Sequence, residues 1–104
     1  MFDRNTSCAY RSYLMQFEWD EEKAVSNLKK HGVSFKEAES VFGDPLARTF
    51  EDDVHSYEEK RNAIFGHSSM NRLLIVSYTE RENDRIRIIS TRLATPKESR
   101  RYAN

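Results

Sequence analysis

The stretch from residue 73 to residue 91, LLIVSYTERENDRIRIIST, decides the fold because it contains two strands and the turn between them. Residues 73–79 and 85–91 are rich in β-branched and aromatic side chains, and the polar residues 81–84 are typical of a hairpin turn. Simple alternation along the second strand predicts two faces. One face carries Arg85, Arg87, Ile89 and Thr91, and the other carries Ile86, Ile88 and Ser90, with Ile86 and Ile88 directed to the core.

Further strands are predicted on the N-terminal side of this hairpin, at residues 17–19, 46–50 and 61–66. Residues 68–71 form the turn that joins the last of these to residue 73, and residues 51–59 form an acidic, polar connection. Two helices are predicted between the first two strands. Asp20 suits the N-cap of the first helix, and Gly32 suits the position just after its end.

The second helix is predicted to begin at a capping box made by Ser34 and Glu37 and to end before Gly43. A second capping box, Thr95 with Glu98, predicts a terminal helix over residues 96–102. The resulting order is β-α-α-β-β-β-β-α. It predicts an α+β domain in which two helices pack on one face of a mostly antiparallel sheet.

Charge is distributed unevenly along the 104 residues. The chain has 17 Lys and Arg against 17 Asp and Glu, so its net charge is zero. Residues 18–60 carry six basic and twelve acidic groups, a net −6, whereas residues 81–104 carry seven basic and three acidic groups, a net +4. Such asymmetry indicates a charged partner, so neutrality does not exclude a nucleic acid.

Composition sets several other limits. No run of 18 apolar residues occurs, so we expect no membrane span, and we expect a cytoplasmic protein. The single cysteine, Cys8, has no partner for a disulfide. Residues 1–14 show no clear periodicity, and we expect a single domain over residues 15–104. Two interpretations of residues 1–14 stay open: a flexible arm, or sequence upstream of a natural start at Met15.

A sheet covered by helices on one face leaves the polar side chains of its other face as candidate site residues. Arginines near strand ends are candidates for phosphate binding, because the planar guanidinium gives two parallel charge-assisted hydrogen bonds. These arginines, with a tyrosine and a glutamate that end one strand and a histidine that ends another, predict a basic cleft with an acid–base member. The candidates are Arg61, Arg87, Arg92, Tyr78, Glu80 and His67. The alternatives are solvated arginines paired with carboxylates, a core position for Tyr78, and a charged hairpin tip at residues 81–85.

The other histidines have separate interpretations. His31 ends the first helix, where a cation is favoured, so it either caps the helix or contacts RNA together with Lys30. His55 lies in the acidic connection, but its spacing matches no metal motif. No phosphate-binding glycine loop, nucleophile elbow or zinc-protease motif occurs, so we expect neither a metal nor a cofactor.

Several segments, in order along residues 15–102, resemble the BrnT family of toxins. The opening segments are FEWD at 17–20, Lys23, Asn27, KHGVSF at 30–35, Phe42 and DP at 44–45. The later ones are Arg61, Gly66, YTER at 78–81, IRIIS at 86–90, RLAT at 92–95 and ESRRY at 98–102. Members of the family begin close to the FEWD segment, which favours Met15 as the start.

The resemblance implies a RelE-like fold and a ribonuclease toxin of a type II toxin–antitoxin module that cleaves mRNA and arrests translation. It also implies a BrnA-like antitoxin of the ribbon-helix-helix kind, whose complex with the toxin represses the operon by binding operator DNA. The competing hypothesis is a module without catalytic activity that only holds a DNA-binding partner protein.

A metal-free cleavage mechanism follows from this resemblance. A base removes the proton of an RNA 2′-hydroxyl, which attacks the adjacent phosphorus, and arginines stabilise the charge that develops. We assign Arg61, Arg87 and Arg92 to phosphate, Glu80 or His67 to the base, and Tyr78 to stacking or proton donation. The RNA track is assigned to five further residues: Lys23, Lys30, His31, Arg81 and Arg85.

Overall fold

The computed structural model describes residues 15–51 and 60–103, so Cys8, His55 and the predictions for residues 1–14 lie outside the described residues. The elements follow the predicted order, with boundaries shifted by one or two residues. They are β1 (Gln16–Glu18), α2 (Glu21–His31), α3 (Phe35–Val41), β2 (Arg48–Glu51), β3 (Arg61–His67), β4 (Leu73–Arg81), β5 (Arg85–Leu93) and α4 (Pro96–Ala103). Within these ranges, no helix is both long enough and apolar enough to cross a membrane.

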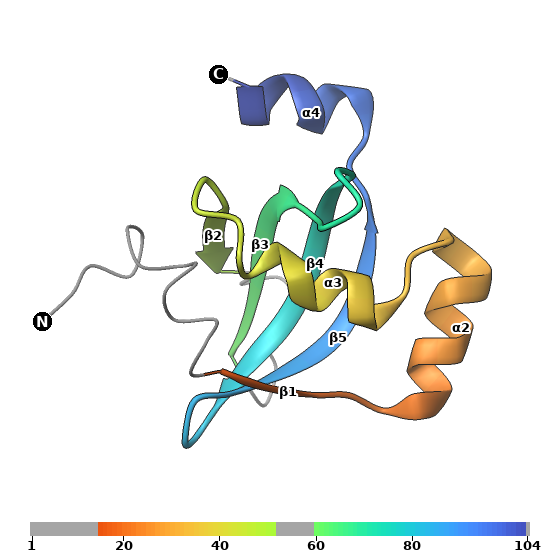
Figure 1. The fold of residues 1–104 in the computed structure, drawn as a ribbon, viewed down its shortest axis with the longest axis vertical. Helices are drawn as coiled ribbons and strands as arrows, with labels where there is room; N and C mark the ends of the chain where they lie inside the picture. The colour runs from red at the N-terminus through yellow and green to blue at the C-terminus, as the bar shows by residue number, and fades with distance from the viewer. Residues whose placement is uncertain (1–14, 52–59, 104) are drawn as a thin grey trace, which may run out of the picture.

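The five strands form one sheet in the order β1-β5-β4-β3-β2. Strands β2 to β5 pair antiparallel, and β1 adds to β5 in parallel. In Figure 1, α3 crosses in front of the central strands, α2 lies beside β5, and α4 lies at the end of the sheet where β5 finishes. The predicted α+β fold with a mostly antiparallel sheet is confirmed. We call the sheet face opposite α3 the open face.

Local hydrogen bonds explain why the two N-terminal helices begin and end where they do. Asp20 Oδ1 accepts from the Lys23 backbone N–H at 3.1 Å, and Gly32 ends α2 in the left-handed region with φ 69°. Ser34 Oγ accepts from the Glu37 N–H at 3.0 Å, but the Glu37 carboxylate does not complete a capping box. It binds Arg72 and the Ser68 hydroxyl instead, so only half of the first predicted box forms.

The core lies between α3 and the sheet. Phe35, Val41 and Phe42 at α3 are at most 2% exposed, and they pack with Ile64, Leu74, Val76, Tyr78, Ile86 and Ile88 from the strands. The Phe42 ring lies 5.0 Å from the Tyr78 ring and 5.1 Å from that of Phe17. Burying a side chain of this size contributes roughly 1.5–3 kcal/mol. The core therefore fixes α3 across the centre of the sheet.

The end of β5 departs from simple alternation. Tyr78 of β4 pairs with Ile88, but its neighbour Ser77 pairs with Ser90, so Ile89 is an extra residue in a β-bulge. Beyond the bulge the two faces exchange. Thr91, only 1% exposed, is in register with the core residue Val76. The prediction of Thr91 beside Arg87 and of Ser90 beside Ile88 is wrong, because alternation ignores the inserted residue.

Candidate active site

Cross-strand partners on the open face form three rows. The first row contains Arg61 of β3, Thr79 of β4, Arg87 of β5 and Glu18 of β1. The second contains Ala63, Ser77 and Ser90, and the third contains Phe65, Ile75 and Arg92. Neighbouring strands lie about 4.8 Å apart, so the members of a row are adjacent. Arg92 joins this face only because of the bulge.

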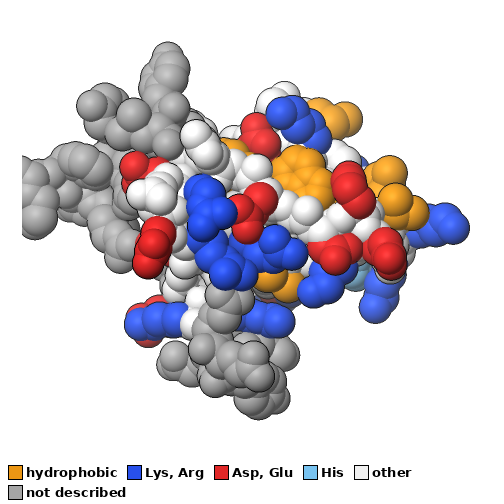
Figure 2. Space-filling view, turned by 90° about the horizontal axis from the view of Figure 1, so that it is seen from below, with side chains coloured by type: hydrophobic (Ala, Val, Ile, Leu, Met, Phe, Trp, Pro, Cys, Tyr) orange, Lys and Arg blue, Asp and Glu red, His pale blue; other side chains and the backbone are white. Residues whose placement is uncertain are grey.

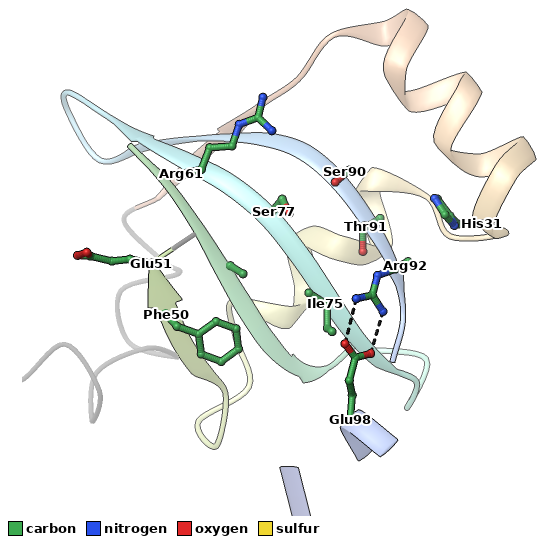
Figure 3. Close-up of a pocket in the computed structure, with 11 residues that line it drawn as sticks. His31, Phe50, Glu51, Arg61, Ile75, Ser77, Ser90, Thr91, Arg92 and Glu98 are labelled. Atoms are coloured by element: carbon green, nitrogen blue, oxygen red, sulfur yellow. Dashed lines mark hydrogen bonds and ion pairs between the residues drawn. The ribbon is translucent and has the colours of Figure 1, made fainter. Parts of the chain in front are cut away.

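The small side chains of the second row form the floor of a cavity of about 580 Å³, which we call the trough. Arg61 lies toward one end, and Arg92 toward the other (Figure 3). The rest of its lining comes from Phe50 and Glu51 of β2, His31 of α2, Glu98 of α4, Ile75 of β4 and Thr91 of β5. The floor thus carries two hydroxyl groups, with a permanent positive charge toward each end.

Arg92 is held by an ion pair with Glu98. Its Nη1 and Nη2 atoms donate to the two carboxylate oxygens at 2.8 and 3.0 Å. Glu98 also accepts from the Thr95 backbone N–H at 2.8 Å and so completes the capping box of α4. The hydrogen bonds from Arg92 lower the pKa of Glu98 to about 2, and the same contacts raise the pKa of Arg92. Glu98 is therefore a charged anchor for Arg92 rather than a proton carrier near neutral pH.

Asn27 attaches α2 to the bulged end of β5. Its side-chain amide donates to Thr91 O at 2.9 Å and to Val33 O at 3.0 Å, and its Oδ1 accepts from the Thr91 N–H at 3.1 Å. Asn27 is 7% exposed. His31 follows it by four residues and so shares its helix face. This clamp brings the imidazole of His31 to the Arg92 end of the trough (Figure 3).

The first row is rich in charge but internally paired. Arg87 and Arg85 each donate to one oxygen of the Glu18 carboxylate at 3.1 Å. Between Arg61 and Arg87, Thr79 is 2% exposed, and its hydroxyl has no hydrogen-bond partner among the described residues. Seen from the end below β1, the surface shows Lys and Arg side chains next to Asp and Glu (Figure 2). The basic C-terminal part of the chain is therefore balanced locally by carboxylates.

Comparison with known proteins identifies the family. A family model described as the ribonuclease toxin, BrnT, of type II toxin–antitoxin systems matches residues 19–98. The chain belongs to this family. As a BrnT toxin of a type II system, it has an antitoxin as its partner.

A solved structure supports the fold of this BrnT chain. The crystal structure of the Brucella abortus ribonuclease toxin, BrnT, superposes with a TM-score of 0.62 at 24% sequence identity, covering 78% of this chain and 97% of that one. A search of curated proteins found no match. The BrnT resemblance noted from the sequence and the expected fold are both confirmed.

The trough of this BrnT chain gathers only some of the predicted site residues. Arg61, Arg92 and His31 line it, and Arg87 lies in the first row beside it. Tyr78 lies on the other face, 4% exposed and in edge contact with Phe42. Glu80 is exposed near the end of the same strand, where it pairs with the core residue Ile86.

The remaining predicted residues do not line the trough. His67 ends β3, six residues from Arg61 and so roughly 20 Å away, with its ring 5.5 Å from Tyr102 of α4. Lys23 and Lys30 are exposed on α2, and Lys23 lies eight residues, roughly 12 Å, from His31. Arg81 and Arg85 face each other beside the β4–β5 turn.

Sequence reasoning did not assign the other eight residues of the trough to the site: Phe50, Glu51, Ala63, Ile75, Ser77, Ser90, Thr91 and Glu98. Glu98 was recognised only as a capping residue. Its second role carries no sequence signal, because its partner Arg92 is six residues away across a strand end. Over residues 15–51 and 60–103, no group of three or more His, Cys, Asp or Glu side chains is arranged to hold a metal ion.

Proposed function

We propose that this BrnT toxin is an endoribonuclease that cleaves mRNA without a metal ion, through attack of a 2′-hydroxyl on the adjacent phosphorus. The observation that carries the proposal is the trough, a groove on the open face with Arg61 and Arg92 toward its two ends. Both guanidinium groups stay charged at any working pH and offer forked donors to phosphate oxygens. They supply the positive charge that the transition state requires.

The reaction needs stabilisation of a phosphorane-like transition state. As the 2′-oxygen bonds to phosphorus, negative charge grows on the non-bridging oxygens, and the bond to the 5′-oxygen breaks to leave a 2′,3′-cyclic phosphate. Preorganised donors at such a charge are worth several kcal/mol. Arg92 is preorganised because Glu98 fixes its guanidinium on two sides. Phe50, 48% exposed on the rim, offers a ring on which an RNA base stacks.

The first row supplies a second set of phosphate contacts. Arg61 and Arg87 flank the Thr79 hydroxyl, which has no hydrogen-bond partner within the described part of the chain. That hydroxyl is buried, so a phosphate oxygen over this row would accept from the guanidinium groups of Arg61 and Arg87. Arg81 and Arg85 extend the track toward the hairpin, and Lys30 extends it along α2. We assign Tyr78 to the core, where it packs.

The partner we propose is a BrnA-like antitoxin with a ribbon-helix-helix DNA-binding domain, through which the complex represses its operon. The support is membership of a type II family together with the net charge of −6 over residues 18–60, which favours a basic partner. Cleavage of mRNA and control of transcription would place the protein in the cytoplasm.

Incubation of purified toxin with single-stranded RNA, with and without EDTA and ribosomes, tests the proposal. We expect cleavage that survives chelation and products that end in a 2′,3′-cyclic phosphate. No cleavage under any condition would favour the module that only holds a DNA-binding protein, and cleavage abolished by EDTA would refute the metal-free mechanism.

Three arginine variants and a matched control test the assignments. Losing one preorganised donor typically slows catalysis by about 10²–10³-fold, so Arg61→Ala and Arg92→Ala should abolish growth arrest while antitoxin binding persists. Arg87→Ala should weaken growth arrest as well, and full toxicity of this variant would remove Arg87 from the mechanism. Arg101→Ala, exposed on α4, is the control and should stay toxic.

A further inference from the structure

We infer that His31 is the general base that removes the proton of the RNA 2′-hydroxyl, held in place by the clamp of Asn27 on β5. The inference rests on the proposed RNA cleavage and assigns its proton acceptor. The sequence alone offered His31 as a helix cap or an RNA contact, and it offered Glu80 or His67 as the base. The trough gives a reason to choose differently.

The base must lie where the phosphate is bound. Among the described residues that line the trough, three side chains can accept a proton: His31, Glu51 and Glu98. His67 lies two residues beyond Phe65 on β3, where its ring packs against Tyr102 of α4, and Glu80 lies near the end of β4 in register with a core residue. Neither of these side chains lines the trough between Arg61 and Arg92.

The two carboxylates of the trough are poor proton acceptors in this geometry. Glu98 uses both oxygens on Arg92, and its pKa of about 2 is far from a working pH. A general base is most effective when its pKa lies near the pH at which the enzyme works. The carboxylate of Glu51 points away from the other labelled residues (Figure 3) and binds Lys60 Nζ at 2.8 Å.

The imidazole of His31 fits the role by position and chemistry. The three hydrogen bonds of Asn27 fix the last turns of α2 against Thr91, between the trough residues Ser90 and Arg92. His31 is half-buried there, and its ring is directed toward Arg92. Histidine is the side chain whose charge changes between about pH 5 and 8.

The charged groups around His31 come from several elements. Arg92 of β5 and the carboxylate of Glu98 on α4 share its end of the trough, and Arg61 of β3 and Glu51 of β2 lie across the floor. Lys29 and Lys30 precede it on its own helix. Arg92 is paired with Glu98, so the imidazole shares this end of the trough with a bound carboxylate as well as with a guanidinium.

The proton balance of the step is complete. Neutral His31 takes the proton of the 2′-hydroxyl as the 2′-oxygen bonds to phosphorus, and the bond from phosphorus to the 5′-oxygen breaks. A water molecule gives a proton to the leaving 5′-oxygen, and the imidazolium then protonates the hydroxide that remains. RNA is converted into a 2′,3′-cyclic phosphate and a 5′-hydroxyl, with no net change in the protein.

The test compares two histidine variants on single-stranded RNA that the wild-type toxin cleaves. A general base contributes on the order of 10²–10⁴-fold, so we expect His31→Gln to lower kcat by about 100-fold or more. Glu22→Gln, a change at an exposed position of the same helix, is the control and should keep wild-type activity. His67→Gln tests the competing assignment of the base and should lower kcat far less than His31→Gln. Both histidine variants should bind antitoxin and keep the wild-type circular dichroism spectrum.

The pH profile and chemical rescue separate catalysis from structure. Wild-type kcat should fall as the pH drops from about 8 to 5, because protonated imidazole cannot accept a proton, and His31→Gln should lack this fall. Imidazole added to His31→Ala should restore cleavage, which a purely structural role would not allow. The inference would be overturned if folded His31→Gln kept the wild-type kcat or showed the same pH profile as the wild type. It would also be overturned if His67→Gln lost activity while His31→Gln kept it. Absence of cleavage by the wild type would instead refute the proposed ribonuclease function.

Discussion

Replacement of Glu98 by glutamine tests the anchor of α4 and of Arg92 together. Lowering the carboxyl pKa from its ordinary value of about 4.5 to about 2 corresponds to at most roughly 3.5 kcal/mol, at about 1.4 kcal/mol for each pKa unit. Solvent screens part of this, because the side chains of Arg92 and Glu98 are 42% and 29% exposed. We therefore expect Glu98→Gln to lower the free energy of unfolding by about 1–2 kcal/mol at pH 7.

The pH dependence gives the sign of the effect. Glu98 has a lower pKa in the folded state than in the unfolded state, so its contribution is complete above about pH 4.5 and is lost as the pH falls toward 2. Urea unfolding of wild type and variant at pH 7, 4 and 2 measures this. The difference between the two proteins should shrink to about a tenth of its neutral value at pH 2.

Glu39→Gln is the matched control, because Glu39 pairs with Lys36 at 3.3 Å and the Lys36 side chain is 79% exposed. This variant should change the free energy of unfolding by less than about 0.5 kcal/mol at each pH. If Glu98→Gln is as stable as wild type at pH 7, or is equally destabilised at pH 7 and pH 2, the ion pair does not anchor α4 as argued.

Three further variants probe the clamp, a tight contact and the trough floor. Asn27→Ala leaves buried groups of Thr91 and Val33 without partners and should lower the free energy of unfolding by about 2–4 kcal/mol in urea. Gly66→Ala places a Cβ 2.9 Å from Asp44 Oδ2, so it should lower the free energy of unfolding by about 1–3 kcal/mol and lower the Tm. An unchanged Tm would mean that the segment around Asp44 moves to make room for the methyl group. Ser77→Leu fills the floor and should reduce RNA cleavage by about tenfold or more while antitoxin binding and Tm stay near wild type.

Local sequence rules predicted the elements of this fold well, because their signals act within a few residues. Asp20, Ser34 and Thr95 each cap a helix, and Gly32 has the positive φ expected after a helix end. The alternation of Ile86 and Ile88 with arginines predicted which face of β5 is buried. Such signals depend on backbone geometry that neighbouring residues determine.

The site was harder to predict, because its contacts join residues far apart in the chain. The hydrogen bonds of Asn27 to Thr91 span 64 residues, and Glu37 leaves its capping role for Arg72, which lies 35 residues away. Tyr78 carries no local sign of the face on which it lies. Only the register of β4 with the bulged β5 determines which polar side chains share the trough with Arg61.

The bulge at Ile89 makes the composition of the trough depend on strand pairing as well as on residue identity. Arg87 and Arg92 are five residues apart, and on a strand without a bulge this spacing would place them on opposite faces. Because Ile89 lies outside the register with β4, its deletion would leave Ser90 paired with Ser77 and Arg92 paired with Ile75. Homologous chains that are one residue shorter at this point would therefore keep the guanidinium beside Glu98, whereas a chain that paired Ile89 with Ser77 would turn Arg92 toward α2 and α3.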